Sequence, residues 1–191
     1  MTTLCLIRHG QTDWNKKFLI QGRENNPLNE EGIIQAYVTA NLLLNNDSNW
    51  DVIISSPLIR AVQTAEIIKD KLNLKSPIII NNNVIEREFG AAEGLTISEE
   101  VYDRINNDDY DNLETCKELQ KRSMDTIIDI VKSFPNKKIL IITHSHFIKG
   151  LLTQIDSNFT WTSSLKNASI NYVYFNELNI IDYKTNVEYK K

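Results

Sequence analysis

The chain has 191 residues, of which 41% are hydrophobic and 24% charged, with a formal net charge of −4 at pH 7. These values are typical of one globular domain with a sizeable core, so we expect a single domain over residues 1–191. The acidic balance argues against general nucleic-acid binding, which needs a basic surface. No segment resembles a signal peptide or a membrane span, so we expect a cytoplasmic protein without a membrane partner.

The first predicted elements are a buried strand over residues 4–7 and a helix that begins after Asn29. Asn29 is a good N-cap, and two glutamates follow it in the first turn, where they complement the helix dipole. The sequence places four apolar residues on one face of this helix: Ile33, Tyr37, Ala40 and Leu44. We expect that face to be directed towards the core.

A second strand and helix follow in the same order. Residues 52–54 are predicted to form a buried strand, and Ser56-Pro57 favours a helix start with Ser56 as the N-cap. The predicted buried stripe of that helix is Ala61, Ala65, Ile68 and Leu72. A third strand is expected over residues 78–80.

The second half of the chain continues the alternation. We expect a helix over residues 114–134, a strand over 138–142, a helix over 147–155 and a late hairpin from 171–175 and 178–183. The inward residues of the long helix are predicted to be Cys116, Leu119, Ile127 and Ile130. Strands alternating with helices indicate an α/β fold, a mainly parallel sheet covered by helices on both faces. Residues 95–113, rich in Asp, Asn and Glu, are predicted to form a short lid over the carboxyl edge of the sheet.

Side chains suited to catalysis follow each of the first four strands. His9 follows the first strand, Arg60 the second, Glu86 and Arg87 the third, and His144 the fourth. In a parallel sheet these positions lie at one edge, where ligands bind in open α/β folds. The sequence therefore predicts a single pocket built around two imidazoles.

The residue types in this pocket favour phosphate chemistry. Arg8, Arg60 and Arg87 carry planar cations that match phosphate oxygens, and Asn15 and Gln21 add neutral donors. An imidazole can accept a phosphoryl group as a nucleophile, and a carboxylic acid can protonate the departing alkoxide. Because arginines offset the charge of the transition state, this chemistry requires no metal.

Each residue also has an ordinary structural explanation. A lone histidine after a strand is usually a hydrogen-bonded structural residue, and a lone arginine is usually a surface cation. His144 and His146 lie two residues apart, but no acid or thiol accompanies them at a metal-binding spacing. We therefore assign His146 to the start of the following helix and expect no metal site.

Five segments together resemble the histidine phosphatase superfamily, in its phosphoglycerate mutase-like branch. They are RHGQTDWN (8–15) with Gln21-Gly22, PLNEEG (27–32), SSPLIRAVQTAEI (55–67), EREFGAAEG (86–94) and ITHSHFIKGLL (142–152). Their order and spacing follow the family over residues 4–155, most closely its small bacterial broad-specificity phosphatases. The resemblance implies a three-layer αβα sandwich, no metal and no cofactor.

The resemblance also implies a role for each matching residue. His9 matches the residue that becomes phosphorylated, and Glu86 matches the proton donor. The other matched positions are phosphate-pocket residues Arg8, Arg60 and His144, and further phosphate or substrate contacts Asn15, Gln21, Gly22 and Arg87. Ser145 replaces the usual glycine after the second histidine, but its backbone N–H remains for phosphate binding. Leu113 replaces the glycine of a Gly-Glu-Ser/Thr block, and we expect Glu114 still to serve the helix start.

The short lid favours phosphatase over mutase activity. A mutase must shield its phosphohistidine from water, which calls for an extensive lid. Three alternatives stay open: a cofactor-dependent phosphoglycerate mutase, favoured by the Glu86-Arg87 pair; a pathway enzyme such as α-ribazole phosphatase; and a catalytically silent phosphate-binding module. The expected partner is a small phosphorylated metabolite, and the sequence leaves a homodimer open.

The composition of the lid gives an expectation about substrate charge. Its acidic residues are Glu99, Glu100, Asp103, Asp108, Asp109 and Asp111, with Arg104 as its cation. An acidic rim disfavours highly phosphorylated sugars and favours simple monoesters. Because His9 must be neutral and Glu86 protonated, we also expect a bell-shaped pH profile.

Overall fold

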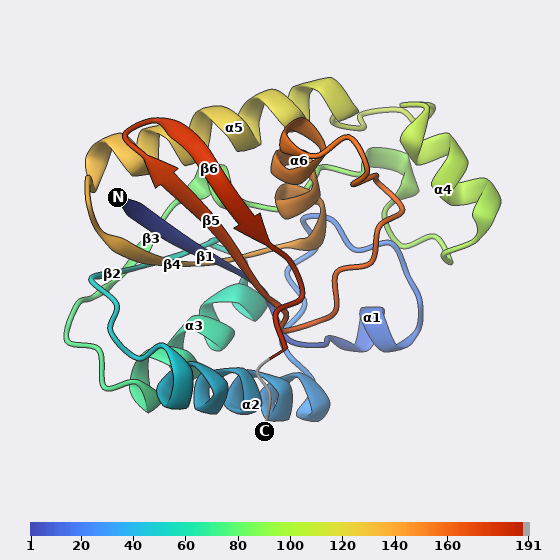
Figure 1. Ribbon diagram of the computed structural model, residues 1–191. Coiled ribbons are helices and arrows are strands. Elements are labelled where there is room, and N and C mark those ends of the chain that lie inside the picture. The colour runs from blue at the N-terminus through green and yellow to red at the C-terminus, as the bar shows by residue number, and fades with distance from the viewer. Residues whose placement is uncertain (189–191) are drawn as a thin grey trace.

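Six strands form one sheet in the order β3-β2-β4-β1-β5-β6 in the computed structural model, which describes residues 1–188 (Figure 1). The strands are β1 Thr2–Arg8, β2 Val52–Ser55, β3 Ile78–Ile80, β4 Lys138–Thr143, β5 Ile170–Asn176 and β6 Asn179–Lys184. The first four pair in parallel, and β5 and β6 add an antiparallel hairpin at one edge. The predicted mainly parallel sheet and late hairpin are confirmed.

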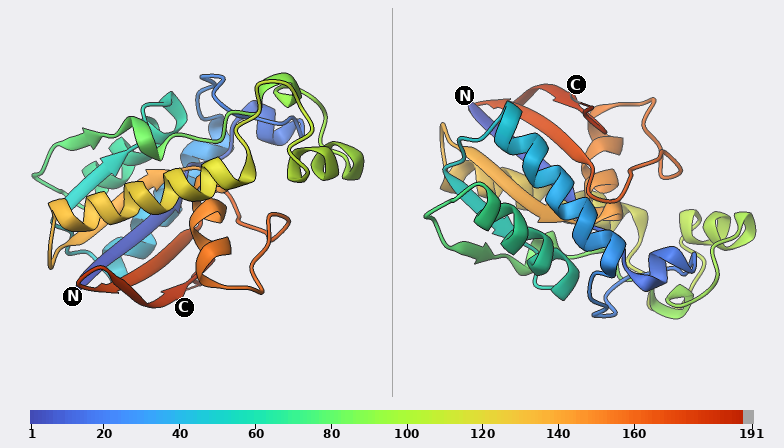
Figure 2. Two further views of the ribbon diagram at one scale, coloured as in Figure 1. Left: turned by 90° about the horizontal axis from the view of Figure 1, so that it is seen from above. Right: turned by 90° about the horizontal axis from the view of Figure 1, so that it is seen from below.

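Helices cover both faces of this sheet. The main helices are α2 Glu30–Asn46, α3 Ile59–Lys71, α5 Cys116–Ser133 and α6 Ser145–Ile155. Figure 2 shows α5 and α6 over one face and α2 and α3 over the other. The shorter elements are α1 Asp13–Lys16, η1 Asn82–Val84, η2 Gly90–Ala92 and α4 Glu99–Asn106. The three-layer αβα sandwich is therefore confirmed.

The two cores follow from the alternation of side chains along the strands. In β1, Leu4 and Leu6 belong to the core beneath α5 and α6, while Cys5 and Ile7 belong to the core beneath α2 and α3. Because both faces are covered, every residue of the strand interior is apolar, which is why these strands were readable from sequence. Among the described residues, no helix is long and apolar enough to cross a membrane.

The predicted core face of α2 is wrong at three of its four positions. Ile33, Tyr37 and Leu44 are 39%, 50% and 41% exposed, whereas Ala40 is buried as predicted. The face that packs inward carries mostly small residues instead: Gly32, Ala36, Thr39, Ala40 and Leu43. The first turn of α2 lies so close to the loop after β1 that a Cβ on Gly32 would stand 2.0 Å from the Gln11 carbonyl oxygen.

Helix α3 begins later than Ser56-Pro57 predicts. Its first residue is Ile59, whose N–H donates to Asn25 Oδ1 at 2.7 Å. Ser56 Oγ accepts from the Leu58 N–H at 3.3 Å and contacts His144 Nε2 at 2.7 Å. Ser56 therefore contacts His144 and stabilises a turn before the helix. The predicted buried stripe of α3 is correct throughout.

The long helix α5 begins two residues later than predicted. Thr115 is its N-cap, in a capping box with Glu118, and Cys116 is only partly buried. Glu114 lies before the cap and binds Arg122, from Nε at 2.7 Å and from Nη2 at 2.8 Å. The predicted inward residues of α5 further along the helix, from Leu119 onwards, are buried as expected.

The lid, residues 95–113, contains helix α4, capped by Ser98. Ile105 is buried in a separate small cluster with Ile20, Phe89 and Ala92. Figures 1 and 2 show α4 beyond the carboxyl ends of the parallel strands. The lid therefore stands over the edge where the sequence places the catalytic side chains.

Candidate active site

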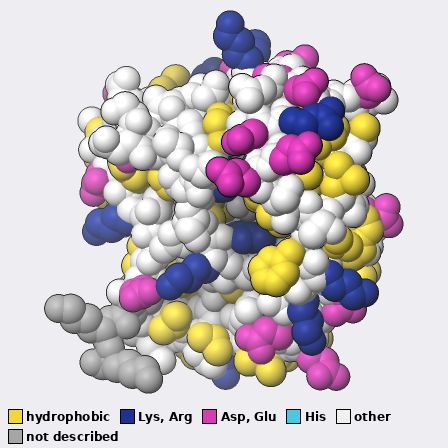
Figure 3. Space-filling model, turned by 90° about the vertical axis from the view of Figure 1, so that its right-hand side faces the viewer, with side chains coloured by type: hydrophobic (Ala, Val, Ile, Leu, Met, Phe, Trp, Pro, Cys, Tyr) yellow, Lys and Arg dark blue, Asp and Glu magenta, His cyan; other side chains and the backbone are white. Residues whose placement is uncertain are grey.

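A cavity of about 650 Å³ opens at the carboxyl edge of the sheet, beneath the lid. Figure 3 shows the hollow on this face, with a basic side chain at its floor and acidic side chains along one rim. Arg8, His9 and Glu86 lie at its inner end, Tyr102 comes from the lid, and Lys149 comes from α6. The cavity therefore collects side chains from segments far apart in the sequence.

His9 is buried at the inner end of the cavity and is held as a neutral imidazole. Its Nδ1 lies 2.7 Å from the Gly10 carbonyl oxygen, which can only accept, so Nδ1 carries the proton. Arg60 Nε donates to His9 Nε2 at 3.2 Å. Burial, followed by the charges of Arg60 and Arg8, lowers the pKa of His9 well below its ordinary value. The unprotonated ring nitrogen is therefore Nε2, and its lone pair, which accepts from Arg60 here, is the one a nucleophile requires.

Arg60 is fully buried beside His9 and is fixed by two backbone carbonyls. Nη1 donates to Glu24 O and Nη2 to Gly22 O, both at 2.7 Å. Burial lowers the pKa of Arg60 to about 10. Gly22 was predicted as a phosphate contact, but its N–H donates to Glu93 Oε1 at 3.0 Å and its carbonyl holds Arg60. Gly22 therefore positions the cation.

Three buried nitrogen atoms near His9 have no hydrogen-bond partner among the described residues: Arg8 Nε, Gln21 Nε2 and His144 Nδ1. Arg8 Nη1 is fixed by the Leu165 carbonyl oxygen at 2.6 Å, and Gln21 Oε1 accepts from Thr12 at 2.6 Å. Buried donors are nearly always satisfied in folded proteins. A cluster of unsatisfied donors is therefore suited to bind an anion.

His144 lies behind His9, with the two ring centroids 5.1 Å apart. Its Nε2 contacts Ser56 Oγ, which leaves Nδ1 as the unsatisfied nitrogen. Burial first, then the charge of Arg60, lowers the pKa of His144 well below its ordinary value. His144 is thus a neutral imidazole at the position that the sequence predicted for the second histidine, with Nδ1 available to a ligand.

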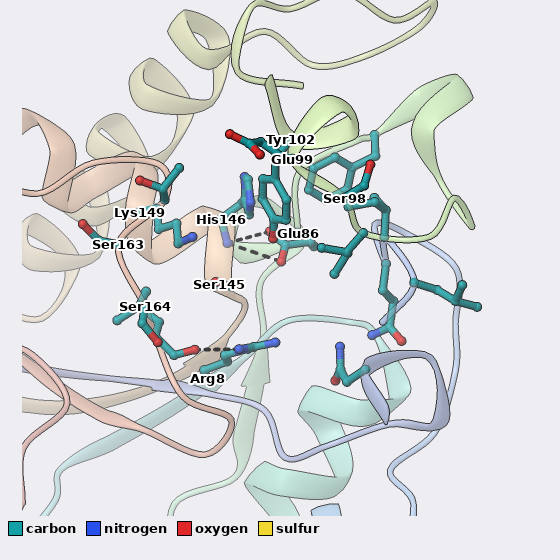
Figure 4. Close-up of a pocket in the computed structure, with 18 of the residues that line it drawn as sticks. Arg8, Glu86, Ser98, Glu99, Tyr102, Ser145, His146, Lys149, Ser163 and Ser164 are labelled. Atoms are coloured by element: carbon teal, nitrogen blue, oxygen red, sulfur yellow. Dashed lines mark hydrogen bonds between the residues drawn. The ribbon is translucent and has the colours of Figure 1, made fainter. Parts of the chain in front are cut away.

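Glu86 is a buried carboxyl at the cavity wall. Its Oε1 accepts from the backbone N–H of Arg87 at 2.8 Å and of His146 at 3.1 Å (Figure 4). Burial raises the pKa of Glu86, although these N–H groups and Arg60 act in the opposite direction. Figure 4 also shows the Tyr102 ring reaching down from the lid towards Glu86. Glu86 is placed to be a proton donor.

Arg87 does not line the cavity, and its role as a phosphate or substrate contact stays a prediction; its buried Nη1 has no hydrogen-bond partner among the described residues. Its Nη2 donates to the Ile105 carbonyl oxygen at 3.1 Å and to Asp108 Oδ1 at 2.8 Å, and its Nε donates to the Glu114 carbonyl oxygen at 2.7 Å. All three acceptors belong to the lid or to the segment after it. Arg87 therefore fastens the lid.

The remaining predicted contacts lie on the cavity wall. Asn15 Oδ1 accepts from the Thr12 N–H and from Asn167 Nδ2, both at 3.2 Å, so its own amide N–H groups are the donors left for a ligand. Ser145 is the first residue of α6 and lines the cavity. The replacement of glycine by Ser145 thus leaves the site open.

Sequence reasoning missed several cavity residues. His146 does lie in the first turn of α6, but its ring also lines the cavity, between the rings of Phe89 and Trp161. Lys149 follows one turn later on the same helix face, so the i, i+3 and i, i+4 spacing from His146 and Ser145 was a usable signal. Of the acidic lid residues, Glu99 and Asp103 line the cavity.

Comparison with known proteins identifies similar chains. Residues 4–181 match the pattern of the histidine phosphatase superfamily (branch 1). The chain is 40% identical to the uncharacterized phosphatase PhoE of Bacillus subtilis, over 97% of this chain and 96% of that protein. It is 31% identical to the putative phosphoserine phosphatase 2 of Hydrogenobacter thermophilus, over 91% and 90%. A phosphoserine phosphatase mutant of Entamoeba histolytica, solved with phosphoserine, superposes with a TM-score of 0.83 at 26% identity, covering 97% of each chain.

Proposed function

The chain belongs to the histidine phosphatase superfamily and is a phosphatase, and on that premise we propose that it hydrolyses small phosphomonoesters through a phosphohistidine on His9. The observation that carries this proposal is the neutral His9 surrounded by unsatisfied buried donors. Arg8 Nε, Gln21 Nε2 and His144 Nδ1 supply hydrogen bonds to phosphoryl oxygens next to the lone pair of His9. Nucleophile and anion site therefore coincide.

The first half-reaction transfers the phosphoryl group to His9. Nε2 forms a bond to phosphorus while the phosphorus–oxygen bond to the alcohol breaks, and Glu86 gives its proton to the departing oxygen. Arg60 Nε donates to His9 Nε2 in the free enzyme, so it must first turn its hydrogen bond to a phosphoryl oxygen before the Nε2 lone pair can attack. The arginines offset the charge that develops on the equatorial oxygens.

The second half-reaction returns the enzyme to its starting state. Glu86, now ionised, takes a proton from water, the water oxygen attacks phosphorus, and the bond to His9 Nε2 breaks. Inorganic phosphate leaves. The open cavity beneath a lid with one short helix supports entry of water, and this distinguishes a phosphatase from a mutase that reorients its substrate.

Phosphate release from p-nitrophenyl phosphate, phosphoserine and 3-phosphoglycerate tests the proposal, with a metal chelator present throughout. We expect the native enzyme to keep its activity in chelator, and His9→Ala to lose a factor on the order of 10³ or more while its circular dichroism stays native. Activity that survives His9→Ala, or that disappears with chelator, contradicts the proposal. Isomerisation of 3-phosphoglycerate without net phosphate release, with 2,3-bisphosphoglycerate supplied, supports the mutase instead.

We also propose that the substrate is a small phosphorylated metabolite and that the enzyme acts in the cytoplasm. The cavity volume of about 650 Å³ suits a small molecule. Cys5 and Cys116 are both free thiols, which is the usual state of cysteines in a reducing compartment. Fractionation of the cells that make the protein, followed by immunodetection, tests the location.

A further inference from the structure

The outer face of helix α2 is apolar, although it lies at the surface of the molecule. Of the thirteen large apolar side chains that are exposed among residues 1–188, five lie on α2: Ile33, Ile34, Tyr37, Val38 and Leu44. Their spacing of three and four residues places them on one side of the helix. Figure 2 (right) shows α2 at the outside of the molecule, with no described helix or strand in front of it. A contiguous apolar patch on a surface helix marks a face that a partner covers.

The same helix carries charge in its first turn alone. Glu30 and Glu31 begin α2, and residues 32–46 contain no charged side chain. A surface helix that faces water normally presents charged residues on its outer side. A helix that lies on a membrane carries lysine and arginine on its polar face, and α2 has neither. The outer face of α2 therefore fits a protein surface that is itself apolar and uncharged.

The surface around α2 has both a ridge and the grooves that could receive one. Ile34 and Val38 line a groove of about 360 Å³ on one side of the helix, together with residues 166–170. Ile33 and Tyr37 line a second groove, of about 470 Å³, between α2 and α3. Two packed helices insert the ridge of one into the groove of the other. This surface is therefore complementary to a second copy of itself.

We propose that α2 is the interface of a homodimer, in which the α2 helices of two copies pack antiparallel about a two-fold axis. The axis passes near Val38, the middle residue of Glu30–Asn46, so Val38 lies beside its counterpart in the second copy. Antiparallel packing places the glutamates of the two first turns at opposite ends of the interface. A helix of 17 residues is about 25 Å long, and with its flanking grooves it matches an interface of roughly 800 Å² per partner.

The proposed interface lies apart from the catalytic site. No residue of α2 lines the active-site cavity, so a dimer of this kind leaves both cavities open. The inner side of α2 contacts the loop after β1, where Gln35 Oε1 accepts from the Gln11 N–H at 2.9 Å. Substitutions on the outer face keep that contact. The dimer can therefore be tested without disturbing the phosphatase activity, and it does not depend on that activity.

Sedimentation velocity over a range of protein concentrations tests the interface. We expect the native chain to sediment as a dimer, and the dissociation constant to rise at least about 100-fold for Val38→Lys and, separately, for Val38→Glu, because two like charges then meet at the axis. Ile181→Lys is the matched control, since Ile181 is similarly exposed but lies on β6. Circular dichroism and phosphate release from p-nitrophenyl phosphate verify that each variant folds.

Mixing Val38→Lys with Val38→Glu tests the two-fold symmetry. Each variant alone should be monomeric, whereas the mixture should sediment as a dimer, because opposite charges then meet at the axis. A mixture that stays monomeric overturns the two-fold placement of Val38. The interface itself is overturned by a native chain that is monomeric at every concentration, or by a dimer that Ile181→Lys dissociates and the Val38 variants do not. Native monomers that sediment with phosphatidylglycerol vesicles would assign the face to a membrane and overturn the proposal as well.

Discussion

At the scale of single residues, burial shifts the pKa values of the nucleophile and of the acid in opposite directions, and both shifts favour the reactive form. The same removal from water lowers the pKa of His9 and raises that of Glu86, because each group becomes more stable uncharged. A neutral imidazole can attack phosphorus, and a protonated carboxyl can donate to the leaving oxygen. Burial of both side chains thus prepares both partners of the reaction.

Glu86→Gln should slow hydrolysis according to the leaving group. With phosphoserine, whose alkoxide needs a proton, we expect kcat to fall by roughly 10²- to 10⁴-fold. With p-nitrophenyl phosphate the loss in the first step is much smaller, because nitrophenolate leaves without help. The new amide retains an oxygen acceptor for the N–H groups of Arg87 and His146, so the fold should be preserved. Burst kinetics of nitrophenolate release measure the first step directly.

The pH profile gives the control for this variant. The rate falls on the acid side as His9 becomes protonated, and on the alkaline side as Glu86 loses its proton. Because burial raises the pKa of Glu86, the alkaline decline should begin above the range of an exposed glutamate, and Glu86→Gln should abolish that decline. An equal loss of rate for both leaving groups, with the alkaline decline still present, would exclude Glu86 as the donor.

The sequence predicted which residues lie at the sheet edge better than it predicted where their side chains point. His9, Glu86 and His144 were readable because each follows a strand, and the sheet edge brings such positions together. Arg87 follows a strand too, but its guanidinium turns away under the lid, where the Ile105 and Glu114 carbonyl oxygens hold it. Lys149 was not predicted, because the search for site residues considered positions directly after strands, and Lys149 lies one turn inside helix α6.

At the scale of elements, the lid is fastened from below by Arg87. This guanidinium connects the segment after β3 to the C-terminal half of the lid, through Ile105 and Asp108, and to Glu114 directly after it. Its Cζ also lies 5.7 Å from the ring centroids of Phe89 and Trp161. The lid is therefore anchored to the wall of the active site.

Arg87→Met should loosen the lid and destabilise the fold. We expect the free energy of unfolding to fall by about 3 kcal/mol, since several buried acceptors lose their donor. Cleavage by a protease within residues 107–113 should become faster. Urea unfolding and limited proteolysis measure both effects, with Arg104→Met as the control because its pair with Asp109 is exposed.

The same variant separates the two roles considered for Arg87. If Arg87 contacted phosphate, Arg87→Met would weaken inhibition by inorganic phosphate and leave the lid intact. That result would contradict the lid role and restore the role that the family resemblance implied.

Elements with continuous apolar runs were predictable, whereas helix faces and starts depended on packing. The interior of β1 is apolar throughout because both faces of the sheet are covered. In α2, a hydrophobicity rule favours Ile33 and Tyr37 for the core, but the close approach of Gly32 to Gln11 requires small residues there. The inward face of α2 can therefore be identified only from the contact between its first turn and the loop after β1.

At the scale of the whole molecule, the buried histidines that build the site also make the folded state less stable at acidic pH. Three histidines, His9, His144 and His146, are buried near one sheet edge, and burial is the main cause that lowers the pKa of each. Unfolding exposes them to water, where they bind protons below about pH 6.5. Below that pH the unfolded state therefore binds more protons than the folded state.

Stability should fall as the pH drops from about 6.5 towards 5. The histidines favour uptake of up to three protons on unfolding, and the raised pKa of Glu86 opposes this by up to one. The net of about two protons corresponds to roughly 3 kcal/mol per pH unit.

Urea unfolding at several pH values measures this slope of the free energy of unfolding against pH. His146→Phe keeps a ring between Phe89 and Trp161 and should reduce the slope by about one proton; a flat dependence in the native protein would refute this account.

The most direct test of the account is detection of the phosphorylated enzyme. Glu86→Gln is mixed with p-nitrophenyl phosphate, which phosphorylates the enzyme without an acid, while hydrolysis of the intermediate lacks its base. The reaction is quenched in alkaline denaturant, digested and examined by mass spectrometry. The account predicts one phosphoryl group on His9, absent when His9→Ala is combined with Glu86→Gln. A phosphoryl group on another residue, or an unmodified His9 during turnover, would contradict it.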